Sequence, residues 1–251
     1  MAYPILDTNH ADPHFRSICA LAIMAKAPRP GKVKTRLSPP LTPHQAAAIN
    51  TCFLRDTTMN IAGLTEETAC AGVISYTPVG DEHLFDGLLP TGYYLIPQRG
   101  DGFGERLLTT AQDLFKCGFG SVCLIDSDSP TVPTEAFRMA VDALRRPGDR
   151  IVLGPSQDGG YYLIGMKQAH AALFENITWS SAFVLSETVA AIRRIDVELV
   201  TLPLWYDVDD AVTLSILRSE LIDGLQPDFT SLPGYAAEHS RRFLKELDGS
   251  A

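Results

Sequence analysis

The sequence predicts an α/β domain in which a mainly parallel β-sheet is flanked by helices. Short apolar runs, typical of buried strands, alternate with longer segments of helical periodicity along most of the chain. Strands that alternate with helices pair in parallel and are covered on both faces. No internal repeat or low-complexity tract interrupts the 251 residues, so one domain is the simplest interpretation.

Seven segments have the composition of strands. The first, Ile18–Lys26, contains the longest clear apolar run of the chain. Ser121–Ile125 is short and ends at an acidic turn, which is typical of a buried strand. The other predicted strands are Ala69–Tyr76, Tyr93–Pro97, Arg150–Leu153, Tyr161–Met166 and Val197–Leu202.

Helices are predicted between these strands. Thr42 followed by Gln45 has the spacing of a capping box and begins a helix that runs to about Ala62. In the segment Gly102–Lys116, Phe103 and Leu107 belong to one apolar face. Further helices are predicted at Thr134–Arg145, Phe183–Arg194 and Ala211–Leu221.

The composition limits the partners. A net charge of −9 argues against nucleic acid or an anionic membrane as the main partner, and no apolar run reaches the length of a membrane span. The five cysteines are scattered without a C-x-x-C pair, which favours a reducing compartment, and we expect a cytoplasmic protein. We expect residues 1–16 to be a flexible tail, 17–224 the main domain and 225–251 a C-terminal extension; a homodimer is compatible with the sequence.

A basic loop directly follows the first predicted strand. Five positive charges, on Lys26, Arg29, Lys32, Lys34 and Arg36, lie within eleven residues of an otherwise acidic chain. Because ligands of α/β sheets collect beyond the carboxyl ends of strands, this loop is predicted to bind phosphates, with Gly31 allowing close approach of the backbone. A solvated basic loop is the alternative.

Two acidic turns also follow strands. Asp126 and Asp128 end the fourth predicted strand, and Asp207, Asp209 and Asp210 follow the seventh. Carboxylate oxygens suit Mg²⁺ or Mn²⁺, so the first four of these aspartates are candidate metal ligands. The alternatives are a helix-capping turn at residues 126–130 and an N-cap at residue 210.

A glycine-containing turn separates the fifth and sixth predicted strands. Asp158 is a candidate base for an acceptor substrate, with Gly159, Gly160 and Tyr161 beside it, although an Asp-Gly hairpin turn explains the pattern equally well. Trp179 offers an aromatic platform for a sugar or base, or a core side chain. Asp101 and Arg106 enter a nucleotide pocket or merely begin a helix.

Taken in order, these segments resemble a bacterial GT-A-like glycosyltransferase family that was formerly a domain of unknown function. Some of its members are linked to arsenosugar biosynthesis. The matching segments span about Ile18 to Leu221 and are Ala25–Leu37, Asp126–Pro130, Asp158–Gly165, Trp179–Ser181 and Asp207–Asp209. A more distant similarity is to phospholactate guanylyltransferase. One departure is Asp210-Ala211, where the wider superfamily often has Thr-Pro, so that Asp210 is a rival for the metal.

The resemblance implies a single GT-A, nucleotide-diphospho-sugar transferase domain of Rossmann-like type, with Asp128 and Asp209 as the best metal ligands. Three functions remain open. The first is glycosyl transfer from a nucleotide sugar to a small acceptor, with Asp158 and Asp128 as catalytic residues. The second is nucleotidyl transfer from a nucleoside triphosphate to a small phosphorylated substrate, with release of pyrophosphate. The third is a non-catalytic nucleotide-binding module.

Overall fold

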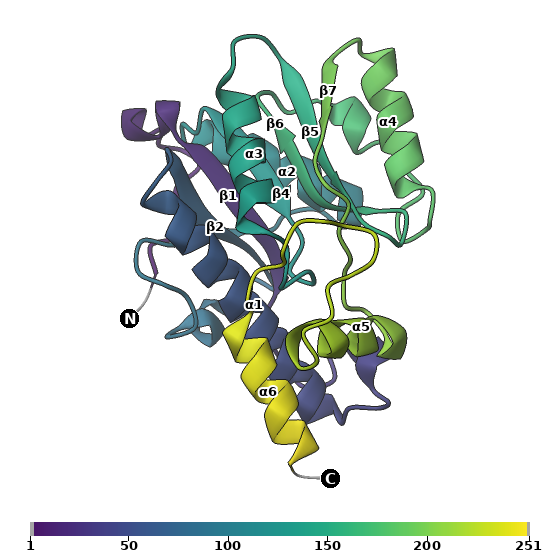
Figure 1. The fold of residues 1–251 in the computed structure, drawn as a ribbon. Helices are drawn as coiled ribbons and strands as arrows, with labels where there is room; N and C mark the ends of the chain where they lie inside the picture. Colours follow the sequence, from purple (N-terminus) through teal and green to yellow (C-terminus); the bar gives the residue numbers. More distant parts are fainter. Residues whose placement is uncertain (1–2, 250–251) are drawn as a thin grey trace.

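The computed structural model describes residues 3–249, and its core is a seven-stranded sheet (Figure 1). All seven predicted strands are present; β4 and β6 have the predicted bounds, and the ends of the other strands differ from the prediction by at most two residues. They are β1 (Cys19–Lys26), β2 (Cys70–Thr77), β3 (Tyr94–Pro97), β4 (Ser121–Ile125), β5 (Arg150–Pro155), β6 (Tyr161–Met166) and β7 (Glu198–Thr201). The predicted fold class is confirmed.

The strands lie in the order β3-β2-β1-β4-β6-β5-β7. The pairs β1–β2, β1–β4, β2–β3 and β5–β7 are parallel, whereas β6 runs antiparallel to both of its neighbours. The turn between β5 and β6 is therefore a hairpin, the alternative that the Asp-Gly pattern left open. Because β5 ends where β4 and β1 end, this turn returns to the edge of the sheet at which the basic loop and the first acidic turn lie.

Helices cover both faces of the sheet (Figure 1). Their bounds are α1 (Pro43–Thr65), α2 (Phe103–Lys116), α3 (Thr134–Arg145), α4 (Val184–Arg194), α5 (Ala211–Leu221) and α6 (Glu238–Asp248). Short 3₁₀ turns occupy Pro13–Ser17, Thr35–Leu37, Glu82–Phe85 and Ala171–Leu173. The predicted capping box is present: the Thr42 hydroxyl accepts from the Gln45 amide, and the Gln45 side chain accepts from the Thr42 amide.

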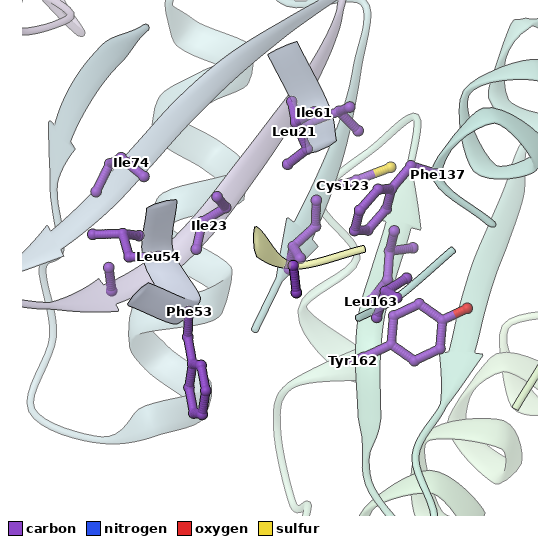
Figure 2. Close-up of a cluster of buried hydrophobic side chains, with 14 of the residues drawn as sticks. Leu21, Ile23, Phe53, Leu54, Ile61, Ile74, Cys123, Phe137, Tyr162 and Leu163 are labelled. Carbon is purple, nitrogen blue, oxygen red and sulfur yellow. The ribbon is translucent and has the colours of Figure 1, made fainter. Parts of the chain in front are cut away.

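The side chains of each central strand point alternately into two separate hydrophobic cores. Leu21 and Ile23 of β1 belong to one core with side chains of α1, where Leu21 lies beside Ile61 and Ile23 near Leu54 (Figure 2). The same core includes Phe137 of α3. The residues of β1 that alternate with Leu21 and Ile23, such as Ala22, face a second core formed with α2 and α4. This alternation follows from the two-residue period of a strand and explains why β1 is buried on both faces.

The first described residues pack on the domain, whereas the sequence predicted a flexible tail there. Ile5 forms a β-bridge with Leu95, and the Leu6 amide donates to the Leu95 carbonyl oxygen at 2.9 Å. Phe15 is buried and stacks on Phe119 at a ring separation of 4.1 Å. Apolar residues this widely spaced give no strand or helix periodicity, so the sequence did not predict that this segment packs on the domain. Residues 1–2 of the predicted tail lie outside the described residues.

The C-terminal extension crosses the molecule and ends in α6, which lies along α1 (Figure 1). The Asp56 carboxylate of α1 accepts hydrogen bonds from the backbone amides of His239 at 2.9 Å and Ser240 at 2.8 Å. It thereby caps the first turn of α6. Within residues 3–249, no helix combines the length and apolar character that a bilayer crossing requires.

Candidate active site

The basic loop is anchored by two buried apolar side chains, Val33 and Leu37. Gly31 has a φ of +71°, and Lys34 has the left-handed conformation with a φ of 47°. Arg29 forms an ion pair with Asp81 at the edge of the loop. Only a few percent of non-glycine residues adopt a positive φ, so the conformation of Lys34 is a local strain that its contacts must offset.

The ammonium group of Lys34 points inward and lies between the two acidic turns. Its Nζ atom is 2.7 Å from an oxygen of Asp128 and 2.8 Å from an oxygen of Asp209. It also donates to the Val208 carbonyl oxygen at 2.8 Å, so three acceptors match its three N–H groups. The side chain is only 4% exposed. Burial lowers the pKa of Lys34, but the two carboxylates outweigh burial and the net pKa is raised.

Asp126 directly follows β4 and belongs to the same acidic turn as Asp128. One of its oxygens accepts from the Ser129 hydroxyl at 2.8 Å and the other from the Asp128 amide at 3.3 Å. Burial and the negative charge of Asp128 raise the pKa of Asp126 well above its usual range. The carboxyl group is therefore held in a place that disfavours its ionised form.

The second acidic turn is joined to the first by the backbone. The Val208 amide donates to the Asp128 carbonyl oxygen at 2.9 Å. Asp207 accepts from the Ser156 hydroxyl at 2.8 Å, and its pKa is raised by burial and by the charges of Asp158 and Asp209. Asp210 accepts from the amides of Val212 and Thr213 as the N-cap of α5. This N-cap is one of the alternatives that the sequence left open, and it commits one carboxylate oxygen of Asp210 to α5.

Two cavities meet at these turns. A basic cavity of about 270 Å³ is lined by Lys26, Lys32, Lys34 and Arg36 from the basic loop, by Asn50 of α1 and by Ser127. A main cavity of about 510 Å³ lies on the other side and has an apolar inner part and an acidic rim. Arg36, Asp128 and Asp209 line both cavities and form the wall that they share.

The chemistry of the acidic residues fits a divalent cation, although the site is not preassembled for one. Carboxylate oxygens are ligands that Mg²⁺ and Mn²⁺ prefer. The pKa values of Asp126 and Asp207 are raised first by burial and then by neighbouring carboxylates, and a bound cation would relieve that repulsion. However, no group of three or more acidic, histidine or cysteine side chains within residues 3–249 is arranged to hold a metal ion. Lys34 already occupies the position between Asp128 and Asp209.

The structure brings most of the sequence-predicted residues to one of these cavities. Lys26, Lys32, Lys34 and Arg36 line the basic cavity. The main cavity is lined by Asp126, Asp128, Asp158, Gly160, Tyr161, Trp179, Asp207 and Asp209. Four predicted residues, Gly31, Asp101, Arg106 and Gly159, are not among the lining residues of either cavity.

Gly159 was expected to lie close to a ligand, but its backbone lies close to another segment of the protein. Gly159 has a φ of +89°, and a Cβ atom there would lie 2.3 Å from the Ala182 carbonyl oxygen. The Gly159 carbonyl oxygen also accepts from the Leu185 amide at 2.8 Å. The glycine therefore fixes the hairpin turn against the start of α4. Arg106 likewise contacts its neighbours, donating to the Asp101 carbonyl oxygen at 3.0 Å.

Sequence reasoning missed the apolar part of the main cavity. Met24, Leu107, Leu124 and Ile164 line it, together with Phe103. The helical periodicity assigned Phe103 to the apolar face of its helix, but Phe103 is 44% exposed in the structure. Periodicity identifies an apolar face without distinguishing contact with the core from contact with a cavity. Ser156, which holds Asp207, gave no signal beyond its place in the turn.

Comparisons with known proteins agree with this architecture. Residues 60–181 match the model of a family described as "Uncharacterized protein conserved in bacteria" (DUF2064). A structure from Desulfovibrio desulfuricans G20, provisionally named a nucleotide-diphospho-sugar transferase, is 29% identical with a TM-score of 0.76. The match covers 92% of this chain and 95% of that one. The predicted resemblance is confirmed. The predicted class of enzyme, a transferase, is confirmed with it.

More distant structures share the fold. A CMP:2-keto-3-deoxy-manno-octonic acid synthetase, complexed with CTP, has a TM-score of 0.53 at 11% identity, over 83% of this chain and 100% of that one. A 4-diphosphocytidyl-2C-methyl-D-erythritol synthase from Anaerococcus prevotii DSM 20548 has a TM-score of 0.51 at 12% identity, over 84% and 99%. None of the curated proteins matches the chain.

Proposed function

We propose that the protein transfers a sugar from a nucleotide-diphospho-sugar to a small uncharged acceptor. The observation that carries the proposal is the charge of the main cavity. Five carboxylates line it, those of Asp126, Asp128, Asp158, Asp207 and Asp209, and Arg36 is the one basic side chain among the described lining residues. The Arg36 side chain is 75% exposed, so water screens much of its charge.

This charge distribution disfavours the nucleotidyl-transfer alternative. That reaction needs a phosphorylated second substrate beside the acidic turns, in the main cavity. Two like charges 4 Å apart near a protein surface repel by about 4 kcal/mol. Lys34 offsets part of the charge on Asp128 and Asp209, and burial disfavours the ionised forms of Asp126 and Asp207. The net charge of the main cavity is therefore smaller than five carboxylates would give, but it remains negative. An uncharged acceptor avoids this penalty, whereas the diphosphate of a sugar nucleotide meets a basic cavity in which four basic side chains outnumber the two carboxylates of Asp128 and Asp209.

The two cavities suggest how the substrates are arranged. The diphosphate binds in the basic cavity, and the sugar reaches across the shared wall toward the main cavity. The bond between the anomeric carbon and the diphosphate oxygen breaks, and the diphosphate leaves with the electron pair. The acceptor oxygen forms the new bond to that carbon. Lys26, Lys32 and Arg36 stabilise the negative charge on the departing diphosphate. Lys34, whose three N–H groups already have acceptors, holds the two acidic turns together.

Asp158 is the proposed base that takes the proton of the acceptor hydroxyl group. One of its oxygens accepts from the Gly160 amide at 2.8 Å, which fixes the orientation of the carboxylate at the rim of the main cavity. Asp128 and Asp209 would hold a Mg²⁺ or Mn²⁺ ion through oxygens that do not contact Lys34. Such an ion would supply further charge neutralisation to the leaving diphosphate.

Product analysis tests the reaction. The protein is incubated with Mn²⁺, a panel of nucleotide sugars and small alcohols, and free nucleoside diphosphate is quantified. Asp158→Asn should lower kcat by about 10²-fold or more, as expected for loss of a general base. Gln157→Ala, an exposed neighbour, should retain activity. Pyrophosphate release from a nucleoside triphosphate would instead establish the nucleotidyl reaction, and nucleotide binding without turnover of any donor would favour the non-catalytic module.

We also place the protein in the cytoplasm. All five cysteines are free in the structure, and four of them are buried. Cys19 and Cys123 lie with their sulfur atoms 3.9 Å apart without forming a disulfide. Free thiols in such proximity suit a reducing compartment. This location can be tested by fractionating cells that produce the epitope-tagged protein and measuring the tag in each fraction.

A further inference from the structure

The inner part of the main cavity is built from apolar side chains of three elements. Leu124 of β4, Ile164 of β6 and Leu107 of α2 line it, and each is at most 3% exposed. None of these side chains can pair with a hydroxyl group. Because they are so little exposed, they form the base of the cavity and leave its accessible apolar surface mainly to the less buried aromatic residues Phe103, Tyr161 and Trp179. A hydroxyl group placed against apolar surface without a partner is unfavourable, so a ligand that is polar throughout fits this part of the cavity poorly.

An aromatic wall borders the same space. Phe103, at the start of α2, meets Trp179 edge to face with ring centroids 5.2 Å apart. Tyr161, at the start of β6, meets Trp179 edge to face at 6.5 Å. The three rings come from distant parts of the chain, and all three line the main cavity. Aromatic clusters of this kind offer both ring faces and ring edges to a further ring.

The backbone is adapted to bring this wall together. A Cβ atom at Gly104 would lie 2.4 Å from Trp179 Nε1 and 2.6 Å from the Phe174 carbonyl oxygen. Only glycine therefore permits the first turn of α2 to lie this close to Trp179. On the opposite side, the hairpin turn is fixed against Ala182 through Gly159. The wall is thus held in place on both sides.

The charged groups among the described lining residues of the main cavity are five aspartates and Arg36, and the serines Ser156, Ser180 and Ser181 add hydroxyl groups. Asp158 and Asp207 lie there beside Ser156, whose hydroxyl group donates to Asp207. A ligand with its apolar part inside would present a group at its end to these carboxylates. A hydroxyl group can donate to them, whereas a carboxylate or phosphate would be repelled.

We propose that the acceptor is an alcohol with an apolar, ring-bearing body and no anionic group. The ring binds against Phe103 and Trp179 above the apolar floor, and the hydroxyl group faces Asp158. This assignment rests on the proposed function, because it identifies the main cavity as the acceptor site. It narrows the small acceptor of that proposal to one chemical class.

A binding experiment without nucleotide tests the assignment independently of turnover. The chain has two tryptophans, and Trp205 is fully buried, so a ligand in the main cavity should alter the emission of Trp179. The probes are 2-phenylethanol, its phosphate monoester and glycerol at equal concentrations. We expect saturable change with 2-phenylethanol, at least tenfold weaker binding of the phosphate ester, and no change with glycerol. Trp179→Phe should abolish the signal.

A pair of matched variants locates the site. Phe103→Ser should weaken the binding of 2-phenylethanol about tenfold, the size expected for loss of an aromatic contact and its buried area. Phe183→Ser is the control, because Phe183 is 63% exposed in the neighbouring loop and is not among the residues that line the main cavity. Thermal unfolding and thermal stabilisation by nucleotide establish that both variants fold.

Three results would overturn the assignment: no binding of 2-phenylethanol, tighter binding of its phosphate ester, or equal losses in the two variants. The outcomes separate this inference from the proposed function. Glycosyl transfer to an acceptor that does not displace 2-phenylethanol would refute the assignment and leave the function intact. Binding of the probes as expected, without release of nucleoside diphosphate from any donor, would refute the function alone.

Discussion

Lys34 and Asp209 are 175 residues apart in the sequence, and their side chains form a 2.8 Å ion pair. The pair joins the basic loop after the first strand to the acidic turn after the last one. Asp128, from the middle of the chain, contacts the same ammonium group at 2.7 Å. The counter-ion of the two carboxylates is therefore part of the chain, and any bound metal ion must share them with it.

Removal of this ammonium group should strengthen the response to metal. In Lys34→Met, the oxygens that contact Nζ become available, so Mn²⁺ should raise the melting temperature of the variant more than that of the wild type. Catalysis should fall by about 10²-fold or more, because the group that holds Asp128 and Asp209 in position is lost. Differential scanning fluorimetry with and without Mn²⁺ measures the first effect.

Arg36→Met provides the comparison for that experiment. Arg36 Nη1 lies 4.0 Å from Asp209, and the side chain is 75% exposed, so its removal frees no carboxylate oxygen from a close contact. Its response to Mn²⁺ should resemble that of the wild type. If Lys34→Met and the wild type respond equally to Mn²⁺, the ammonium group does not compete with the metal.

Asp126 should make stability fall as the pH rises. The pKa of Asp126 is raised in the native state, so the native protein binds this proton more tightly than the unfolded chain does. Stability is then greatest below the unfolded pKa and decreases as the pH rises toward the raised native pKa. Each pKa unit of difference corresponds to about 1.4 kcal/mol. Asp126→Asn removes this effect and should be more stable than the wild type at neutral pH.

Urea unfolding between pH 4 and pH 8, with a chelator present, measures the effect. The advantage of Asp126→Asn should shrink as the pH falls, because the wild-type carboxyl group then becomes protonated. Asp142→Asn, on the exposed surface of α3, is the control. A constant difference between Asp126→Asn and the wild type across this range would contradict the prediction.

Gly104 and Gly102 should respond differently to alanine. In Gly104→Ala, the new Cβ atom would lie 2.4 Å from Trp179 Nε1, so Trp179 must move and stability should fall by about 1–3 kcal/mol. In Gly102→Ala, no heavy atom lies within 4 Å of the new Cβ atom, and φ is −91°. Urea unfolding and tryptophan emission should therefore change in the first variant alone. Similar effects of both substitutions would show that Trp179 is not fixed by this contact.

Asp56→Ala should loosen the C-terminal helix. The carboxylate accepts from two amides and from the Ser240 hydroxyl at 2.6 Å, and its loss leaves buried donors unpaired. We expect a loss of about 1–3 kcal/mol in the free energy of unfolding. Hydrogen exchange should accelerate in α6, whereas Ser240→Ala, which removes one of the three donors, should have a smaller effect. Unchanged exchange in α6 would refute this role.

The strands and helices were predictable because each core segment has a clear local pattern. β4 is a short buried strand that is directly followed by Asp126. The helix α1 begins with a complete capping box at Thr42. The reversed direction of β6 was only one of two readings of the Asp158-Gly159 turn, since pairing partners are distant in sequence. The docking of Phe15 on Phe119 left no local signal at all.

The candidate site was predictable as a set of residues but not as a set of contacts. Counting charges identified Lys34 and Asp209, yet nothing in the sequence indicates that Lys34 has a φ of 47° and points inward. A charge run does not reveal which of its members is buried. The apolar inner wall of the main cavity was missed for a related reason, because Phe103 fits the periodicity of a helix that faces the core.

The antiparallel hairpin between β5 and β6 has an evolutionary consequence. Its turn begins and ends within a few residues and is held by Gly159, so insertions or substitutions there can alter the shape of one cavity while β1 and its loop stay unchanged. Under the proposed function, the acceptor side of the site can therefore change while the donor side stays the same. Arg36, Asp128 and Asp209 line both cavities, so a substitution at any of them would alter both at once.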